Sequence, residues 1–295
     1  MKSRDAPLNE SKSRGCLTST VHFQHLTFYL PDNVYKLISG RRVSKVGSML
    51  EKQSKHMNLI EDLKALPLLT SQQGFVYLKG SHHRIRIPRL NNDFAVFLGL
   101  MWGDGWLTNR KLAVAKGDWR VGFVEDDRPL IGVFCELAKA LFCVHANVRD
   151  MKTYCEVYFN SRIVYELLSK SFGFPDGEKI GKLRIPKAVH RAFIADFLRG
   201  LFSTDGKFGV YKNYPRVGLE SATKGLIKDV EVSLKTLGLN PKLYVWNRKG
   251  GNKLYGLHLN GKEQTILFYK KVNFVGEKAN KLDNYIKGIA LKLAP

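Results

Sequence analysis

An internal repeat restricts the fold of this chain more than any other feature of its sequence. The segment Phe97–Gly105 (FLGLMWGDG) matches Phe197–Gly206 (FLRGLFSTDG), and in each a glycine is followed by four residues and then Asp-Gly. Two more pairs of segments match in the same order: Val121–Glu125 with Val217–Ser221, and Phe174–Leu183 with Phe274–Leu282. Three matched pairs in one order predict two copies of a single folding unit.

The periodicity of apolar residues predicts the same series of elements in both copies. In the first copy we expect a helix at Asn92–Gly105, strands at Lys111–Ala115 and Arg120–Glu125, a helix at Pro129–Leu141, and strands at Ala146–Asp150 and Tyr154–Asn160. In the second we expect a helix at His190–Gly206, strands at Phe208–Lys212 and Arg216–Glu220, a helix at Leu226–Leu237, and strands at Lys242–Asn247 and Lys253–Asn260. A closing helix completes each copy. The order αββαββα predicts an α+β fold with antiparallel sheets.

Residues 91–187 and 188–295 are accordingly predicted to be the two repeats, and residues 1–90 a basic, mostly helical extension. Helical patterns within residues 32–67 are interrupted by Ser39–Arg42, which is compatible with a helix-turn-helix DNA contact. A helical appendage packed on the first repeat explains the same pattern. Tyr77–Pro88 has the pattern of a basic strand that leads into the first repeat.

The charge of the chain points to a polyanionic partner. There are 48 Lys and Arg against 26 Asp and Glu, a formal net charge of +22, which exceeds what solubility requires. Because 44% of the residues are apolar, a folded binder of nucleic acid is favoured over a disordered basic tail. No apolar run approaches the roughly 20 residues that span a bilayer, and the N-terminus does not resemble a secretory signal. We expect a protein of the cytoplasm (nucleoid-associated) or an organelle matrix that is not secreted.

Asp104 and Asp205 are the candidate functional residues of the repeated motif. One Asp-Gly pair is an ordinary turn, but both carboxylates end an apolar helix, where the helix dipole disfavours negative charge. A locally unfavourable residue that occurs twice indicates function. The small residues Gly99 and Gly103 would allow this helix to pack closely against its counterpart, which carries Gly200 and Thr204. The two carboxylates would then converge at one end of the helix pair.

Two converging, desolvated carboxylates would repel each other or share a proton. A hard divalent cation removes this conflict, because Mg²⁺ prefers carboxylate and water oxygens and often takes a phosphate as well. A pair of carboxylates, a metal and a basic chain together indicate phosphodiester hydrolysis.

These motifs resemble those of the LAGLIDADG homing endonucleases, specifically the kind with two repeats in one chain, and the resemblance covers about residues 91–290. It implies two αββαββα halves joined by the motif helices, with the sheets forming a saddle on double-stranded DNA. It also implies cleavage of both strands with Mg²⁺, for which Mn²⁺ would substitute, by a monomer that needs no membrane. By this resemblance Asp104 and Asp205 are catalytic metal ligands, and Gly103 and Thr204 belong to the metal site.

The family also has a basic residue beside the scissile phosphate, late in each repeat. Lys179 and Lys278 match this place in their Glu-Lys-x-x-Lys-Leu segments and are predicted to be catalytic. Arg128 and Lys224 are weaker, equivalent candidates for a phosphate contact. Glu125 and Glu220 are shifted by one residue in the alignment and are left outside the predicted site. Trp102 and Ser203 depart from the motif at a position where an acid is frequent, and we expect both to face away from the metal.

Basic residues of the strands and their turns are expected to contact DNA, because two-stranded ribbons fit the major groove. Besides Arg128 and Lys224, the candidates are Lys111, Arg120, Arg149, Lys152, Lys207, Lys212, Arg216, Lys242, Arg248, Lys249 and Lys253. The alternative for any one of them is a solvated position on the sheet.

Two other functions remain open on the same scaffold. One is an RNA maturase that binds intron RNA and assists splicing, and nothing in the sequence separates it from the endonuclease. The other is a DNA-binding regulator that has lost catalysis, which is disfavoured because both aspartates are intact.

Overall fold

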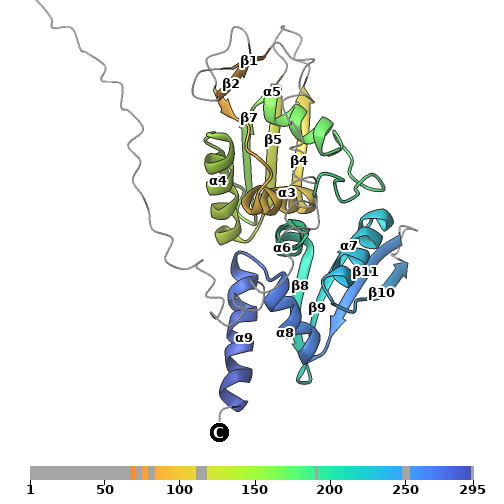
Figure 1. Ribbon diagram of the computed structural model, residues 1–295. Coiled ribbons are helices and arrows are strands. Elements are labelled where there is room, and N and C mark those ends of the chain that lie inside the picture. The colour runs from red at the N-terminus through yellow and green to blue at the C-terminus, as the bar shows by residue number, and fades with distance from the viewer. Residues whose placement is uncertain are drawn as a thin grey trace, which may run out of the picture. The chain divides into compact units, whose positions relative to one another are not determined.

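The structure is a computed structural model, and it describes residues 68–70, 75–78, 84–110, 118–189, 192–247 and 253–293. These residues all lie within one compact unit, His56–Pro295. They form two four-stranded antiparallel sheets, one in each predicted repeat, and a smaller three-stranded sheet that precedes them (Figure 1).

The first repeat has the predicted order of elements. It contains α3 (Asn92–Asp104), β4 (Gly105–Arg110), β5 (Asp118–Glu125), α4 (Arg128–Phe142), β6 (Asn147–Asp150), β7 (Cys155–Asn160) and α5 (Arg162–Glu166), which continues into a π-helical turn at Leu167–Ser171. Its strands pair in the order β4-β5-β7-β6.

The second repeat follows the same order and adds one helix. It contains α6 (Ile194–Asp205), β8 (Gly206–Tyr211), β9 (Tyr214–Ser221), α7 (Lys224–Thr236), β10 (Lys242–Asn247), β11 (Lys253–Asn260), α8 (Lys262–Lys271) and α9 (Glu277–Leu293). Its strands pair in the order β10-β11-β9-β8, so the two sheets have the same topology. The prediction of an α+β fold built from two αββαββα repeats is confirmed.

The first strand of the first repeat, expected at Lys111–Ala115, lies earlier in the chain. The strand begins at Gly105 and ends at Arg110, while residues 111–117 lie outside the described part of the chain. The reason is the end of α3, where Gly105 is already extended, with φ −73° and ψ 158°. The chain therefore enters the sheet without a loop, and Gly206 makes the same transition from α6 to β8.

The helices α3 and α6 pack against each other between the two large sheets (Figure 1). A Cβ atom on Gly99 would collide with the carbonyl oxygen of Phe197, and one on Gly200 with that of Val96. Only glycine permits this approach of two helix backbones, as the spacing of small residues predicted. Every residue of α3 from Phe94 to Gly103 is buried, because α3 has α6 on one side and its own sheet and α4 on the other.

Two aromatic clusters fill the repeats beside these helices. In the first, the ring of Phe134 stacks on Phe123 with centroids 4.6 Å apart and on Phe97 at 5.2 Å. In the second, the ring centroid of Phe268 lies 5.0 Å from the ring centroids of both Phe202 and Phe274. Each cluster joins the motif helix to the rest of its own repeat, so that the helix end is held rigidly.

The part of the N-terminal extension that the structure describes is β rather than helical. β1 (Leu68–Thr70), β2 (Phe75–Leu78) and β3 (Ile85–Arg86) form an antiparallel sheet, which agrees with the strand expected between Tyr77 and Pro88. The predicted helices within residues 32–67 lie outside the described residues. None of the helices described is both long and apolar enough to traverse a lipid bilayer.

Candidate active site and nucleic-acid interface

The ends of α3 and α6 bring Asp104 and Asp205 into one electrostatic cluster. Both pKa values are raised, chiefly because burial destabilises the charged carboxylate. The pKa of Asp205 rises to about 7, and the next cause after burial is the charge of Asp104. The ammonium groups of Lys179 and Lys278 oppose the shift at both aspartates. Two acids from different repeats that interact with each other and with the same two lysines form a single site.

Each predicted catalytic lysine reaches the end of the motif helix of its own repeat. Lys179 Nζ donates to the carbonyl oxygen of Gly103. Lys278 Nζ donates to the carbonyl oxygen of Ser203 at 2.7 Å and to that of Thr204. Burial lowers the pKa of Lys179, while the charges of Asp104 and Asp205 raise it. The two ammonium groups thus stabilise carbonyl oxygens that a helix leaves without partners.

Glu125 belongs to the same cluster, although the alignment of the repeats placed it outside the predicted site. Its pKa is raised to about 8, first by burial, then by a hydrogen bond to Asp126, and then by the charge of Asp104. Contact with the Glu125 carboxyl in turn partly offsets the rise in the pKa of Asp104. The signal in the sequence was the run of acids Glu125–Asp127 directly after a strand, which the one-residue offset of the alignment obscured.

Strand register explains that offset. Gly105 pairs with Phe123 in the first sheet and Gly206 pairs with Leu219 in the second, so Glu125 is equivalent to Ser221. Glu220 lies one position earlier and forms an ion pair with Lys207 at 2.8 Å. The second repeat therefore has a hydroxyl where the first has a third carboxyl group.

The residues that depart from the motif lie on the flanks of the helix pair. Trp102 is buried, and its Nε1 donates to the carbonyl oxygen of Arg184 at 2.8 Å. Ser203 is also buried, and its hydroxyl oxygen accepts from the backbone N–H of Val275 at 2.8 Å. Both side chains hold neighbouring segments instead of pointing to the carboxylates.

On the first sheet, predicted DNA contacts gather around one tyrosine. The guanidinium carbons of Arg120 and Arg149 lie 5.1 and 4.6 Å from the centre of the Tyr158 ring, and Arg149 donates to its hydroxyl at 2.8 Å. Arg128, at the start of α4, forms an exposed ion pair with Asp150 at 2.8 Å. Lys152 is exposed in the turn after β6, with φ +69°.

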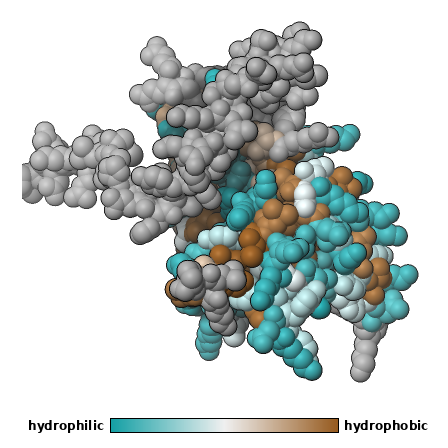
Figure 2. Space-filling view, turned by 60° about the horizontal axis from the view of Figure 1, so that its bottom comes forward, coloured by the Kyte–Doolittle hydropathy of each residue, from teal (hydrophilic) through white to brown (hydrophobic). Residues whose placement is uncertain are grey.

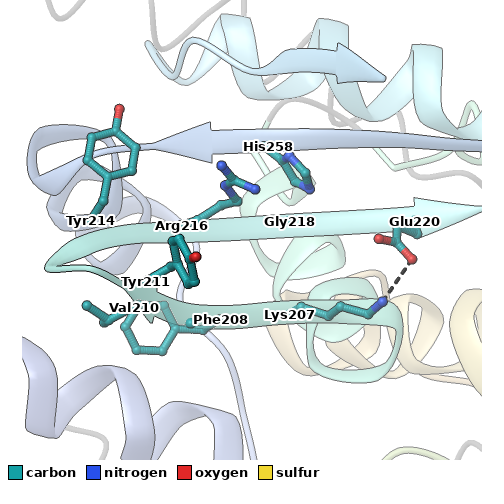
Figure 3. Close-up of a pocket in the computed structure, with 10 residues that line it drawn as sticks. Lys207, Phe208, Val210, Tyr211, Tyr214, Arg216, Gly218, Glu220 and His258 are labelled. Carbon is teal, nitrogen blue, oxygen red and sulfur yellow. Dashed lines mark hydrogen bonds and ion pairs between the residues drawn. The ribbon is translucent and has the colours of Figure 1, made fainter. Parts of the chain in front are cut away.

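On the second sheet, predicted contacts line a groove of about 340 Å³ on the face away from α7 (Figure 3). Lys207 and Arg216 lie in it, with Arg216 Nε donating to Asn260 at 2.9 Å. His258 pairs directly with Lys242 and Gly218, so Lys242 shares this face. Lys253 has the opposite parity on β11 and lies on the face that α7 covers, which disfavours it as a groove contact.

Other predicted contacts lie at the edges of this sheet or outside the described residues. Lys212 is exposed in the turn between β8 and β9, and Lys224 is exposed at the start of α7. Lys111, Arg248 and Lys249 are outside the described part of the chain.

Aromatic residues on the second sheet were not anticipated. Tyr244, Trp246 and His258 lie with ring centroids 4.5 to 6.0 Å apart on the groove side of β10 and β11. Tyr211 and Tyr214, which also line the groove, are exposed as well. Figure 2 shows hydrophobic residues in patches between hydrophilic ones on one face of the molecule. The second sheet therefore offers apolar as well as cationic contacts.

The residues at the helix ends fit a divalent cation. Two partly buried carboxylates with raised pKa values gain most from a positive charge between them, and the adjacent carbonyl oxygens already accept from ammonium groups. Within the described ranges no three His, Cys, Asp or Glu side chains are grouped as metal ligands. A cation held here would use the two aspartates and oxygens from water or substrate, as Mg²⁺ commonly does. The resemblance placed Gly103 and Thr204 in the metal site. In this structure their carbonyl oxygens accept hydrogen bonds from Lys179 and Lys278.

Comparisons with known proteins agree with the motifs. Residues 192–273 match a family described as a LAGLIDADG-like domain. Similar solved structures include I-DmoI in complex with DNA and Ca, at 19% identity over 65% of this chain and 97% of that one, with a TM-score of 0.49. The meganuclease I-SmaMI bound to uncleaveable DNA covers 68% of this chain and 89% of its own, at 13% identity and a TM-score of 0.46.

Curated relatives are much longer than this chain. A probable translation initiation factor IF-2 of Thermococcus kodakarensis is 23% identical over 274 residues, which are 87% of this chain and 22% of the relative. A replication factor C small subunit of Methanocaldococcus jannaschii is 30% identical over 169 residues, 56% of this chain and 8% of the relative. The chain thus spans less than a quarter of these proteins. The second repeat matches a LAGLIDADG-like domain, and the first repeat has the same motif and the same sheet topology.

Proposed function

We propose that the protein is a site-specific endonuclease that hydrolyses both strands of double-stranded DNA with a divalent metal ion. The observation that carries this proposal is the electrostatic interaction between Asp104 and Asp205, one from each repeat, at the ends of two helices that pack together. Because a single chain supplies both acids, we further propose that it acts as a monomer.

The acids, the lysines and the sheets have separate roles in this proposal. Asp104 and Asp205 would hold Mg²⁺ or Mn²⁺, which would supply Lewis-acid stabilisation of the phosphodiester and of the departing oxygen. Lys179 and Lys278 lie beside the two acids and would each offer a compact positive charge to one scissile phosphate. Arg120, Arg149, Lys207 and Arg216 would bind the DNA on either side.

Glu125 would hold and transfer a proton in addition to contributing charge to the site. Burial and the charge of Asp104 help to raise the pKa of its carboxyl to about 8, so near neutral pH it can hold a proton beside the reacting groups. The equivalent Ser221 cannot do so, and the two halves of the reaction would therefore differ in their pH dependence.

Selection from a randomised duplex library tests this function and identifies the target sequence in the same experiment. The purified chain is incubated with the library in Mg²⁺ or in EDTA, and new DNA ends are sequenced. We expect one sequence class to be cut on both strands in Mg²⁺ only, Asp104→Asn to cut nothing, and the control Glu231→Gln, an acid paired with Lys235 on α7, to cut normally. Absence of cleavage in every divalent metal would contradict the proposal.

The aromatic cluster on the second sheet gives one reason to test RNA as well. Exposed rings on a sheet can stack on unpaired bases, and Tyr244, Trp246 and His258 are arranged on such a surface. A maturase that binds intron RNA would therefore lose affinity for single-stranded RNA in Trp246→Ala. Equal weak binding of wild type and this variant to that RNA would leave DNA cleavage as the supported function.

A further inference from the structure

Asp127 is the N-cap residue of α4, and its side chain also contacts the second repeat. Its Oδ1 accepts from the backbone N–H of Leu130 at 3.0 Å and so caps the helix. Its Oδ2 accepts from the backbone N–H of Glu277 at 2.8 Å, 150 residues further along the chain. Glu277 directly precedes Lys278. The cap of a helix in the first repeat therefore holds the segment that carries Lys278. We call residues 174–184 and 274–282 the lysine segments of the first and second repeat.

Thr223 occupies the equivalent position before α7. Its hydroxyl oxygen accepts from the backbone N–H of Gly181 at 3.0 Å, two residues after Lys179. Thr223 makes no side-chain cap to its own helix. A hydroxyl has one oxygen where a carboxylate has two, so Asp127 serves both helix and neighbour while Thr223 serves only the neighbour.

Both cap residues are fixed by the last residue of a strand in their own sheet. Glu125 accepts from the backbone N–H of Asp127 at 3.4 Å, and the equivalent Ser221 accepts from that of Thr223 at 3.1 Å. On the far side, Trp102 and Ser203 bind the lysine segments at Arg184 and Val275. Each lysine segment is thus held between its own motif helix and the opposite repeat.

We propose that Asp127 and Thr223 are positioning residues that act across the repeats, Asp127 on Lys278 and Thr223 on Lys179. A lysine has a flexible four-carbon side chain, so its ammonium group stays at the helix-end carbonyls only if its backbone is fixed. The contact also joins each lysine to the sheet and cap of the other repeat, including Arg128 or Lys224 one residue further on. A phosphate bound by Arg128 or Lys224 would therefore contact the residue next to the cap that positions the lysine of the other repeat. This inference rests on the proposed function only in calling the lysines catalytic.

Lysine reactivity tests the contacts directly. Four folded proteins are treated briefly with an acetylating reagent: the wild type, Thr223→Val, Thr223→Ser and Asp127→Ala. Mass spectrometry then measures the acetylation of Lys179 and Lys278. Because Thr223 is buried, valine keeps its shape and removes only the hydroxyl. We expect about a tenfold faster reaction of Lys179 in Thr223→Val, which is the scale of one lost hydrogen bond, and recovery in Thr223→Ser. In Asp127→Ala the faster lysine should be Lys278.

Strand-resolved nicking of the selected target adds the catalytic readout. Thr223→Val should slow the strand that Lys179→Met slows, and Asp127→Ala the strand that Lys278→Met slows. General loss of stability would affect both lysines and both strands alike, and that result would overturn the inference. If wild type cuts no DNA, the proposed function fails, but the crossed pattern of acetylation still decides the positioning role.

Discussion

The two repeats share a fold but differ in the acids around their motif aspartates. In the first repeat, the strand beside Asp104 leads into three acids, Glu125, Asp126 and Asp127. The equivalent positions in the second repeat, beside Asp205, are Ser221, Ala222 and Thr223. Lysines approach both helix ends in the same manner. Symmetry is therefore kept in the aspartates that we propose as cation ligands, and it is lost in the neighbouring groups that could carry protons.

The sheets differ in a second way. Around Tyr158 the first sheet presents two arginines, while around His258 the second presents Tyr244 and Trp246. Guanidinium groups suit phosphates and guanine, whereas aromatic and apolar side chains suit thymine methyl groups or stacked bases. A pseudo-symmetric scaffold of this kind can recognise a target whose halves are unlike.

The largest effect should come from the residues in which the repeats agree. Asp104→Asn and Asp205→Asn should each lower the cleavage rate of both strands by about 10²–10³-fold or more, because each removes half of the cation site. DNA affinity should persist, as measured by gel shift in Ca²⁺. If both single variants cut one strand at the wild-type rate, the acids do not share a site.

Metal binding should stabilise the folded protein through both repeats equally. With Mn²⁺ at about 100 times its dissociation constant, the free energy of unfolding should rise by about 2.7 kcal/mol. Thermal unfolding at about pH 8 with Mn²⁺ or EDTA, where the carboxyl of Asp205 is mostly ionised, measures this gain. This gain in stability should disappear in Asp104→Asn and in Asp205→Asn and should remain in Glu231→Gln. If the gain survives in Asp205→Asn, the cation is bound by the first repeat alone.

The two sheets should respond differently to substitution. If Arg149 contacts a base, Arg149→Ala should weaken binding to the target by about 1–3 kcal/mol. If Arg149 contacts a phosphate, the substitution should make the affinity depend less steeply on salt concentration. Trp246→Ala should leave the salt dependence unchanged and alter the base preference of the second half-site. Binding titrations at several salt concentrations, with selected half-sites, separate these outcomes. Identical effects of the two variants would remove the distinction between the sheets.

A further prediction concerns pH. The pKa values of Glu125 and Asp205 are raised in the folded protein, to about 8 and about 7, so both groups take up protons more readily when folded than when unfolded. Their contribution to stability is full below their ordinary pKa values and is lost as the pH rises through about 7 and 8. In EDTA the melting temperature should therefore fall over this range. Glu125→Gln should reduce the slope and Ser221→Ala should not.

The sequence was most informative where one position carries the same constraint in both repeats. Asp104 and Asp205, the glycines between α3 and α6, and the order of strands all follow from the repeat, since close helix packing and buried faces need recurring residue types. The strand at Gly105 was misplaced because one glycine both ends a helix and starts a strand. Local patterns treat these as separate events.

The contacts made by Glu125, Asp127 and Thr223 could not be predicted from the sequence. Glu125 differs from its counterpart, so the comparison of repeats gave it no weight. Asp127 and Thr223 resemble ordinary helix caps, and their partners lie in the other repeat. Such residues become visible only when the register of the sheets and the packing between repeats are known.

Crystals grown with target DNA and Mn²⁺ would test the central claim most directly. Anomalous scattering from manganese should give a peak between the carboxylates of Asp104 and Asp205, and that peak should be absent from crystals of Asp205→Asn. Manganese bound only elsewhere, with the two carboxylates bonded to the lysines alone, would contradict a cation site shared by the two repeats.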